Sequence, residues 1–384
     1  MPKKITNTAL ASSLREGLQD PSLMSEEEIK KINKGLSLKG ALPLQALLRV
    51  SVLPFGHLIS IKGEKGTGKS NLGWELMRRF IEAGGIAVFL CTESSDGVEK
   101  QYQLLHDPKY MDSVLYYYNI NSMKRYGEAL LGVMAKIKKR DPEGNVPVIV
   151  VTDSIAAIGD KDVDFANLAP KEMEKAIQEN NMAAAHRAKS LKAVMSTFNP
   201  NFLMDRPVLM VMTNHLYKKI ETNSFGFGNK EYSPCGDYIG YMASAELKMA
   251  KGPKKVGVHG NTSRFIIRNI KQRLGHDWNI KVTAPLVGWT REIDGEDVEC
   301  LGYDWDKALV DLLLSDATSK TDLKEFLTIV KNGASYNCKE LKLKGVSAQE
   351  LGRVIHNNEE LCRKIQKLYK INVYHEVSAD ESKG

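Results

Sequence analysis

Short runs of apolar residues alternate with longer stretches of helical periodicity between about residues 58 and 297. The runs are nearly continuous in Val, Ile and Leu, a pattern typical of a parallel sheet that is covered on both faces. The last runs follow one another without intervening helices, which predicts antiparallel or mixed pairing at that edge of the sheet. The strands that we expect are Leu58–Ile61, Ile86–Cys91, Ser113–Tyr118, Val148–Thr152, Val208–Thr213, Ala245–Lys251, Ser263–Ile270 and Asn279–Val282.

The same pattern divides the chain into regions. Ser25 and Glu28 match a capping box for a helix over Ser25–Lys34, within a segment rich in Lys and Glu. Two helical stretches, Lys307–Leu314 and Glu350–Lys370, lie beyond the last expected strand. The regions that we expect are an N-terminal segment over 1–50, an α/β core over 51–300, a small C-terminal domain over 301–375 and a flexible tail over 376–384.

The composition is that of an ordinary globular protein. A chain of 384 residues can bury one large core with smaller domains beside it. Apolar residues make up 42% and no run approaches the ~18 residues of a membrane span, so we expect no membrane partner. Five cysteines without Cys-x-x-Cys spacing, and an N-terminus without an apolar signal region, predict a cytoplasmic protein with reduced thiols. The net charge of +7 permits a polyanionic partner without requiring one.

The segment between the first expected strand and a helix over Asn71–Ala83 matches the phosphate-binding pattern G-x-x-x-x-G-K-[ST]. Its glycines let backbone amides turn toward a triphosphate, and the helix N-terminus adds partial positive charge. Lys69 can reach the β- and γ-phosphates, and the Ser70 hydroxyl can ligate Mg²⁺. The order of strand, loop and helix disfavours a chance match to a glycine turn. The residues expected to bind ATP are Gly63, Glu64, Lys65, Gly66, Thr67, Gly68, Lys69, Ser70 and Asn71.

Asp153 is the candidate for a second group at the magnesium ion. It ends the apolar run Val148–Thr152, and a carboxylate at the carboxyl end of a neighbouring strand can hold Mg²⁺ through water. The alternative interpretation is an Asp that only caps the next helix.

Glu93 and His215 are the candidates for the hydrolytic chemistry. Glu93 follows Ile86–Cys91, on a strand that we expect beside the phosphate loop, where it can activate the attacking water. The competing interpretation is an exposed turn glutamate. His215, with Asn214, follows the expected strand Val208–Thr213, where a polar side chain can sense the γ-phosphate. A lone His is more often a satisfied polar residue.

The segment Leu216–Gly240 combines cations, aromatic rings and glycines directly after this histidine. Cations can face phosphates while rings stack on bases, at about 1–3 kcal/mol per base, so the segment suits single-stranded DNA of any sequence. The alternative is a surface loop whose aromatics fold back on the protein. Residues 160–181 and the basic turn Lys251–Lys255 are further candidates, the second for duplex phosphates, although it is also typical of a solvated turn. The expected DNA-binding residues are Lys218, Lys219, Phe225, Phe227, Gly228, Asn229, Lys230, Tyr232 and Gly236.

The order of these motifs resembles that of RecA-type strand-exchange recombinases, and Asn214-His215 resembles the phage UvsX-like branch in particular. The resemblance implies that Glu93 is the catalytic glutamate and that His215 senses the γ-phosphate. The stretch from Phe227 to Ser244, including Tyr241, is similar to the second DNA loop of bacterial RecA and the aromatic residue that closes it.

Two later segments strengthen the resemblance, which covers about residues 36–370. Lys271 and Arg273 resemble two cations that UvsX-like proteins project across a protomer interface onto the neighbour's ATP. The stretch from Lys331 to Leu368 is similar to the small C-terminal domain of bacterial RecA. The sequence also departs from the family: Thr152 stands where a second apolar residue is usual, the segment before Phe227 is about three residues longer, and the adenine-stacking tyrosine has only Tyr102 as a candidate.

The resemblance implies an α/β fold, with a RecA-type P-loop ATPase core, a mixed but mostly parallel central sheet flanked by helices, a small N-terminal helical segment and a small C-terminal α/β domain. It further implies ATP and Mg²⁺ as cofactors, DNA-stimulated ATP hydrolysis, and a helical head-to-tail homo-oligomer on single-stranded DNA that exchanges strands with a homologous duplex. A single-strand-binding protein and a loading mediator are further expected partners, in the cytoplasm of a bacterial host if the origin is viral.

Two other classes of function remain open at this point. A hexameric helicase of the DnaB class shares the ATPase motifs but is not expected to carry the C-terminal domain. A nucleotide-gated mediator that binds single strands without hydrolysis is disfavoured by Glu93.

Overall fold

The computed structural model describes residues 35–93, 98–159, 171, 184–219, 230–232, 238–253, 255–257, 260–274, 280–315 and 323–372. The strands are β1 (Gly35–Ser37), β2 (Val52–Pro54), β3 (His57–Gly63), β4 (Ile86–Cys91), β5 (Val114–Tyr117), β6 (Val148–Asp153), β7 (Val208–His215), β8 (Tyr217–Lys219), β9 (Lys230–Tyr232), β10 (Ala245–Lys251), β11 (Lys255–Gly257), β12 (Gly260–Gln272), β13 (Lys281–Ile293), β14 (Glu296–Tyr303), β15 (Ile329–Asn332), β16 (Ser335–Cys338) and β17 (Leu343–Val346). The helices are α3 (Leu42–Leu48), α4 (Lys69–Glu82), α5 (Val98–Leu105), α6 (Met123–Arg140), α8 (Ala184–Phe198), α9 (Tyr238–Met242), α10 (Trp305–Ser315), α12 (Ala348–His356) and α13 (Glu359–Leu368), with short turns η1 (Pro108–Ser113), η2 (Ile155–Ala157) and η4 (Asn199–Leu203).

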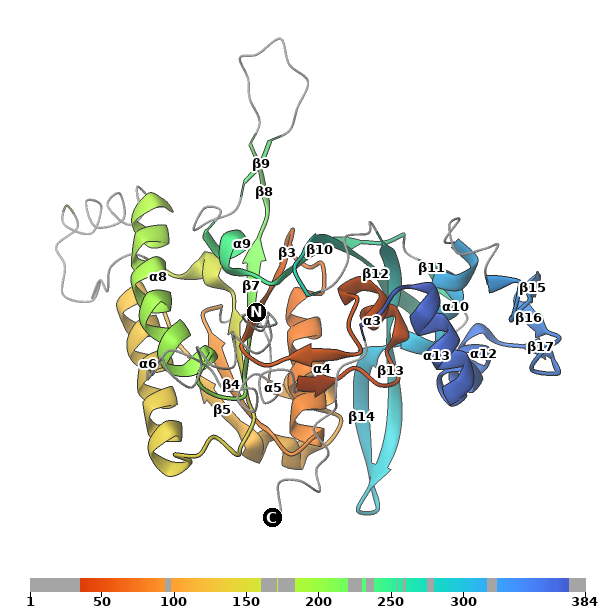
Figure 1. Ribbon diagram of the computed structural model, residues 1–384, viewed down its shortest axis with the longest axis horizontal. Coiled ribbons are helices and arrows are strands. Elements are labelled where there is room, and N and C mark those ends of the chain that lie inside the picture. The colour runs from red at the N-terminus through yellow and green to blue at the C-terminus, as the bar shows by residue number, and fades with distance from the viewer. Residues whose placement is uncertain are drawn as a thin grey trace, which may run out of the picture.

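A ten-stranded mixed sheet forms the centre of the molecule (Figure 1). Its strand order is β14-β13-β12-β10-β3-β7-β6-β4-β5, with β11 paired to β12. The strands from β10 to β5 are parallel to one another, whereas β12, β13 and β14 pair antiparallel at one edge. This arrangement confirms the predicted mixed, mostly parallel sheet and its antiparallel edge.

The order of the strands corrects one expectation from the sequence. Strand β7 lies between β3 and β6, and both β7 and β6 separate β3 from β4. We expected Asp153 and Glu93 at the ends of strands adjacent to the phosphate-loop strand β3. Their strands, β6 and β4, are not adjacent to β3. Crossover helices let the chain skip positions in the sheet, so that proximity along the sequence does not fix adjacency.

Both faces of the parallel strands are apolar and buried. Ile149 and Val151 belong to one hydrophobic core, and the alternate residues Val148 and Val150 belong to a second core on the opposite face. Helix α4 packs on the first face, against β3, β4, β6 and β7, and α6 and α8 cover the second (Figure 1). Alternation of side chains across a strand explains why a continuous apolar run is needed when both faces are covered.

Helix α4 follows the spacing that the sequence predicted. Leu72, Leu76 and Phe80 recur every four residues and are buried against the sheet. The helix begins at Lys69, two residues before the predicted start, because Gly68 caps it in a left-handed conformation. It ends at Glu82.

The C-terminal region contains a small antiparallel sheet of β15, β16 and β17 beside α10, α12 and α13. The prediction of a single helix over Glu350–Lys370 is wrong, because helix α12 ends at His356 and a second helix, α13, begins at Glu359. The Asn358 side chain accepts a hydrogen bond from the Leu361 amide at 3.1 Å and thereby caps the second helix.

Strand β13 is longer than predicted. The strand expected over Asn279–Val282 begins at Lys281 and continues to Ile293, where the turn Asp294-Gly295 leads into β14. Both turn residues have positive φ, 54° and 85°, as a tight hairpin with this sequence requires. Strand β14 was not among the expected strands, although Asp-Gly is a typical turn signal.

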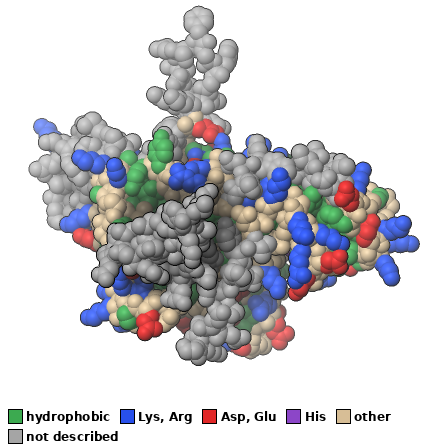
Figure 2. All heavy atoms as spheres, in the orientation of Figure 1, with side chains coloured by type: hydrophobic (Ala, Val, Ile, Leu, Met, Phe, Trp, Pro, Cys, Tyr) green, Lys and Arg blue, Asp and Glu red, His purple; other side chains and the backbone are tan. Residues whose placement is uncertain are grey.

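Some expectations are not decided by the fold. The helix over Ser25–Lys34 lies outside the described residues, and the division into four regions stays a prediction. In the part of the chain that the structure describes, no helix is long and apolar enough to cross a membrane. Lys and Arg side chains on the face seen in Figure 2 are spread over several elements and interleaved with acidic ones.

Candidate functional site

The carboxyl ends of four parallel strands bring the predicted motifs to one edge of the sheet. Gly63 at the end of β3 pairs with His215 at the end of β7. Asp153 at the end of β6 pairs with Cys91, two residues before Glu93. Side chains that are 60 to 146 residues apart in the chain therefore meet at the phosphate loop, because parallel strands end on the same side.

The phosphate loop runs from Gly63 to Ser70, between β3 and α4. A Cβ on Gly63 would lie 2.3 Å from the carbonyl oxygen of Met249 on the adjacent β10, so only glycine fits there. The Thr67 hydroxyl donates to the Glu64 carbonyl at 2.8 Å and closes the loop on itself. The backbone amides at the start of α4 remain available to an anion, since the first amides of a helix have no intrahelical partner.

Lys69 is buried inside this loop. Its ammonium group donates to the carbonyls of Gly63 and Glu64, at 3.1 and 2.9 Å. It also lies 3.4 Å from Nδ1 of His215. Burial lowers the pKa of Lys69, and the nearby carboxylates of Asp153 and Glu93 oppose that shift.

Glu93 accepts hydrogen bonds from His215, the last residue of β7, and from Ser154, which directly follows β6. Nε2 of His215 lies 2.7 Å from Oε1 of Glu93, and the Ser154 hydroxyl donates to the same oxygen at 2.5 Å. The His215 hydrogen bond lowers the pKa of Glu93 to about 2, against the effect of burial and with further help from Ser154. Because an ionised carboxylate can only accept, Nε2 of His215 is the donor to Glu93, and one chain of hydrogen-bond contacts runs from Lys69 through His215 to Glu93.

Asp153 is buried behind this chain, with 8% of its surface exposed. Its Oδ1 accepts a hydrogen bond from the Thr213 hydroxyl at 2.5 Å, which fixes the carboxylate. A carboxylate here and the hydroxyl of Ser70 suit Mg²⁺, which is usually held by one or two protein groups together with substrate phosphates. The described residues contain no cluster of three or more His, Cys, Asp or Glu that could hold a metal on its own.

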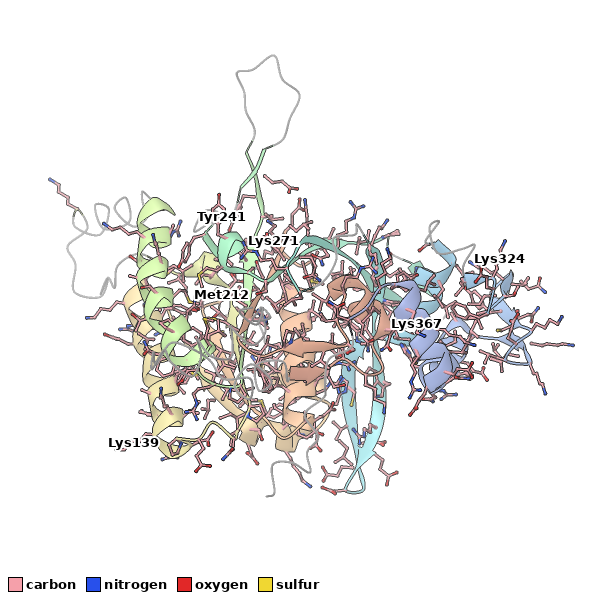
Figure 3. All side chains as sticks on the ribbon, in the orientation of Figure 1. Lys139, Met212, Tyr241, Lys271, Lys324 and Lys367 are labelled. Atoms are coloured by element: carbon pink, nitrogen blue, oxygen red, sulfur yellow. The ribbon has the colours of Figure 1, made fainter. Side chains whose placement is uncertain are left out.

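Lys271 lies away from the phosphate loop of its own chain. On β10, Met249 pairs with Gly63 of the phosphate loop, and Glu246, three residues earlier, pairs with Lys271. Lys271 therefore lies about 10 Å before the end of the sheet that carries the phosphate loop. Its ammonium group donates to the carbonyls of Gly240 and Tyr241. Figure 3 labels Lys271 and Tyr241 close together near α9. Arg273, just beyond β12, is exposed.

The predicted DNA segment begins as an antiparallel ribbon. Strands β8 and β9 pair Tyr217 with Tyr232 and Lys219 with Lys230, and the ribbon extends beyond the edge of the sheet (Figure 1). Only Leu216 separates this ribbon from β7, and its amide donates to the Gly63 carbonyl at 3.1 Å. The expected flexible loop is thus partly regular. The candidates outside the described residues are Phe225, Phe227, Gly228, Asn229, Gly236 and nearly all of 160–181.

Three residues that the sequence analysis did not assign to the site contact it. Thr213 bonds Asp153, Ser154 bonds Glu93, and the Tyr303 hydroxyl donates to the Gly68 carbonyl at 2.9 Å. The first two adjoin motifs that the sequence does reveal, whereas nothing in the local sequence marks Tyr303. Tyr102, the adenine candidate, is 37% exposed on α5 and stays a prediction.

The fold and this edge define a P-loop ATPase with a RecA-type mixed sheet. Comparison with curated proteins gives matches named RecA. The chain is 26% identical to RecA of Aquifex aeolicus over 279 residues, covering 71% of each chain. It is 25% identical to RecA of Brevibacillus brevis over 291 residues, covering 73% of each, and 24% identical to RecA of Mycoplasma mobile over 256 residues, covering 65% of this chain and 67% of that one.

No model of a known protein family matches the chain. The three relatives, together with the sheet and the motifs at its edge, support a recombinase of the RecA family with ATPase activity.

Proposed function

We propose that the protein is an ATP-dependent recombinase that forms a helical filament on single-stranded DNA and pairs that strand with a homologous duplex. The observation that carries the proposal is the hydrogen-bond chain from Lys69 through His215 to Glu93, on a strand that continues directly into the β8–β9 ribbon. His215, which would contact the γ-phosphate, is thus separated from the proposed DNA-binding ribbon only by Leu216.

The phosphate loop would hold ATP, with Lys69 at the β- and γ-phosphates and Tyr102 near the adenine. When bound, Mg²⁺ would neutralise phosphate charge between Ser70 and the Asp153 carboxylate. Lys69 would exchange its carbonyl partners for phosphate oxygens, which a charged donor prefers.

Glu93 would orient and activate the attacking water. Its low pKa keeps the carboxylate ionised at neutral pH, so that it can accept a hydrogen bond from the attacking water in the transition state. His215 would donate an N–H to a γ-phosphate oxygen, and its position would therefore depend on the nucleotide. The β8–β9 ribbon would follow, because it begins two residues later.

Lys271 and Arg273 would contact the ATP of the neighbouring protomer. Their distance from the phosphate loop of their own chain favours this role over one within the same chain. Two cations facing a polyphosphate would hold the interface together while ATP is present and lose their partner after hydrolysis. A head-to-tail interface that does not close into a ring grows into a helix. The N-terminal segment expected to take part in this interface lies, up to residue 34, outside the described residues.

The finer identification remains part of this proposal. The Asn214-His215 motif favours the UvsX-like branch. The protein would then act in the cytoplasm of a bacterial host. A single-strand-binding protein and a loading mediator would be its partners.

Strand exchange between a single-stranded circle and a homologous linear duplex tests the function. We expect joint molecules that require ATP and Mg²⁺, and filaments of variable length in negative-stain images. Closed six-membered rings that unwind a fork would identify a helicase instead. Nucleotide-dependent binding of single strands without ATP turnover would identify a mediator.

A further inference from the structure

The junction between β14 and α10 holds the phosphate-loop helix at two points. Tyr303, the last residue of β14, donates its hydroxyl to the Gly68 carbonyl at the start of α4, at 2.9 Å. Trp305, the first residue of α10, donates its indole N–H to Glu75 at 3.1 Å, about two turns further along α4.

The Tyr303 ring is fixed in place. It is 6% exposed, stands edge-on to Phe265 with ring centres 6.0 Å apart, and lies 5.3 Å from the Trp305 ring. Burial raises the pKa of Tyr303 well above its ordinary value, so the hydroxyl stays protonated and remains a donor.

Gly68 is shaped to receive this hydroxyl. Its φ is +85°, and a Cβ there would lie 2.8 Å from the Tyr303 oxygen and 3.0 Å from the Phe265 ring. Its carbonyl also accepts the first helical hydrogen bond, from the Leu72 amide at 3.1 Å. Both lone pairs of the carbonyl are therefore engaged, and its direction is set from two sides.

The Gly68 carbonyl and the Lys69 amide belong to the same planar peptide group. In a trans peptide the C=O and N–H bonds point in opposite directions, so fixing one fixes the other. The carbonyl points along α4 and the Lys69 N–H points out of its N-terminus, where an anion binds. We propose that Tyr303 is a positioning residue of the nucleotide site, which holds the Lys69 amide in the direction that binds the β-phosphate.

This inference rests on the proposed ATP site and specifies which step the hydroxyl affects. The β-phosphate is present in both ATP and ADP, and its contact with the loop persists through hydrolysis. Loss of the tether should therefore weaken both nucleotides by a similar factor. Loss of binding that is equal in the ground state and the transition state raises KM and leaves kcat nearly unchanged.

The test is Tyr303→Phe in the full-length protein, since this substitution keeps the ring and removes only the donor. Titration with Mg·ADP should show about three- to tenfold weaker binding, as expected for the loss of one neutral hydrogen bond. Steady-state ATP turnover on single-stranded DNA should show a KM for Mg·ATP that is higher by about the same factor. The matched control is Tyr116→Phe, which removes a hydroxyl that accepts from Gln101 at 3.1 Å on the other edge strand, and should bind Mg·ADP like the wild type.

The outcomes separate this inference from the proposed function. Wild-type protein that binds no Mg·ADP or Mg·ATP would overturn the ATP site and this role with it. If the wild type binds Mg·ADP and Mg·ATP and the Tyr303→Phe variant binds them with equal affinity, the positioning role alone would be overturned. A fall in kcat or in binding stoichiometry at unchanged affinity would show a merely structural contribution and would also overturn it.

Discussion

The Glu93 carboxylate is the residue on which the proposed chemistry depends. Two donors from distant parts of the sequence contact it: Nε2 of His215 at the end of β7, and the hydroxyl of Ser154 just after β6. These hydrogen bonds stabilise the ionised form more than partial burial destabilises it, which is why the pKa falls to about 2. A permanently charged acceptor at this position suits a group that orients water.

The substitution Glu93→Gln tests this role. Glutamine keeps the size of the side chain but cannot accept a proton, so we expect DNA-stimulated ATP turnover to fall by about 10²- to 10⁴-fold. Binding of ATP and of single-stranded DNA should persist, because neither requires the carboxylate. Turnover is measured by phosphate release, and binding by titration of labelled nucleotide and oligonucleotide.

The matched control is Glu99→Gln, on the exposed side of α5 a few residues later. It changes the net charge by the same amount and should leave turnover at the wild-type level. Undiminished turnover in Glu93→Gln would remove this residue from the catalytic role.

At the scale of the elements, helix α4 is held by an ionic group beneath the phosphate loop. Glu75 is buried at 3% exposure and accepts hydrogen bonds from Arg78, Arg79 and the Trp305 indole. Burial alone would raise the pKa of Glu75, but Arg79 and Arg78 outweigh it and lower the pKa to about 2. Helix α4 and the start of α10 therefore share one buried charge network.

Glu75→Gln should destabilise the protein by about 3 kcal/mol, because it leaves two arginines beside a neutral partner. The pH dependence follows from the lowered pKa. Ionised Glu75 stabilises the folded state fully above its ordinary pKa of 4.5, and that contribution is lost as the pH falls toward 2. The wild type should thus lose stability more steeply than the variant between pH 5 and pH 3.

Urea unfolding at several pH values measures both effects. The control is Glu82→Gln on the same helix, which removes only the more exposed ion pair with Arg78 and should cost about 1 kcal/mol or less. Equal pH slopes for the wild type and Glu75→Gln would contradict the assignment of the low pKa to this carboxylate.

At the scale of the whole molecule, the two halves of the proposed ATP site lie at different places. The phosphate loop is at the carboxyl ends of the parallel strands, whereas Lys271 lies on β12 beside Glu246, toward the other end. This separation favours a nucleotide shared by two protomers, so that the proposed complete site would need two copies of the chain. The polymer would then be required for catalysis.

Mixing two inactive variants tests this arrangement. A Lys69→Ala protomer keeps its cations, and a Lys271→Ala/Arg273→Ala protomer keeps its phosphate loop. Each alone should hydrolyse ATP very slowly, but an equal mixture should recover about a quarter of wild-type turnover, because one in four head-to-tail interfaces joins the two intact halves. DNA-stimulated phosphate release is the measurement.

Lys281→Ala, an exposed cation on β13, is the control and should be active alone. A mixture no more active than its components would argue against a shared site. Full activity of the Lys271→Ala/Arg273→Ala protein on its own would exclude these cations from catalysis.

Much of the core follows from local pattern. The strands over Ile86–Cys91 and Ala245–Lys251 have the predicted bounds, because buried apolar runs report burial directly. The phosphate loop also lies between a strand and a helix, β3 and α4, as the sequence predicted. The break between α12 and α13 and the β13–β14 hairpin were not predicted, although an Asn cap and an Asp-Gly turn mark them.

The chain of residues by itself determined most strands of the parallel core, the place of the loop that matches the phosphate-binding pattern and the side chains that end those strands, because these properties depend on near neighbours and on burial. Only the tertiary structure decided that β7 lies between β3 and β6, that His215 meets both Lys69 and Glu93, and that Tyr303 reaches Gly68. Those contacts join residues from 122 to 235 positions apart, and their formation depends on how crossovers and packing order the sheet, which no local pattern encodes.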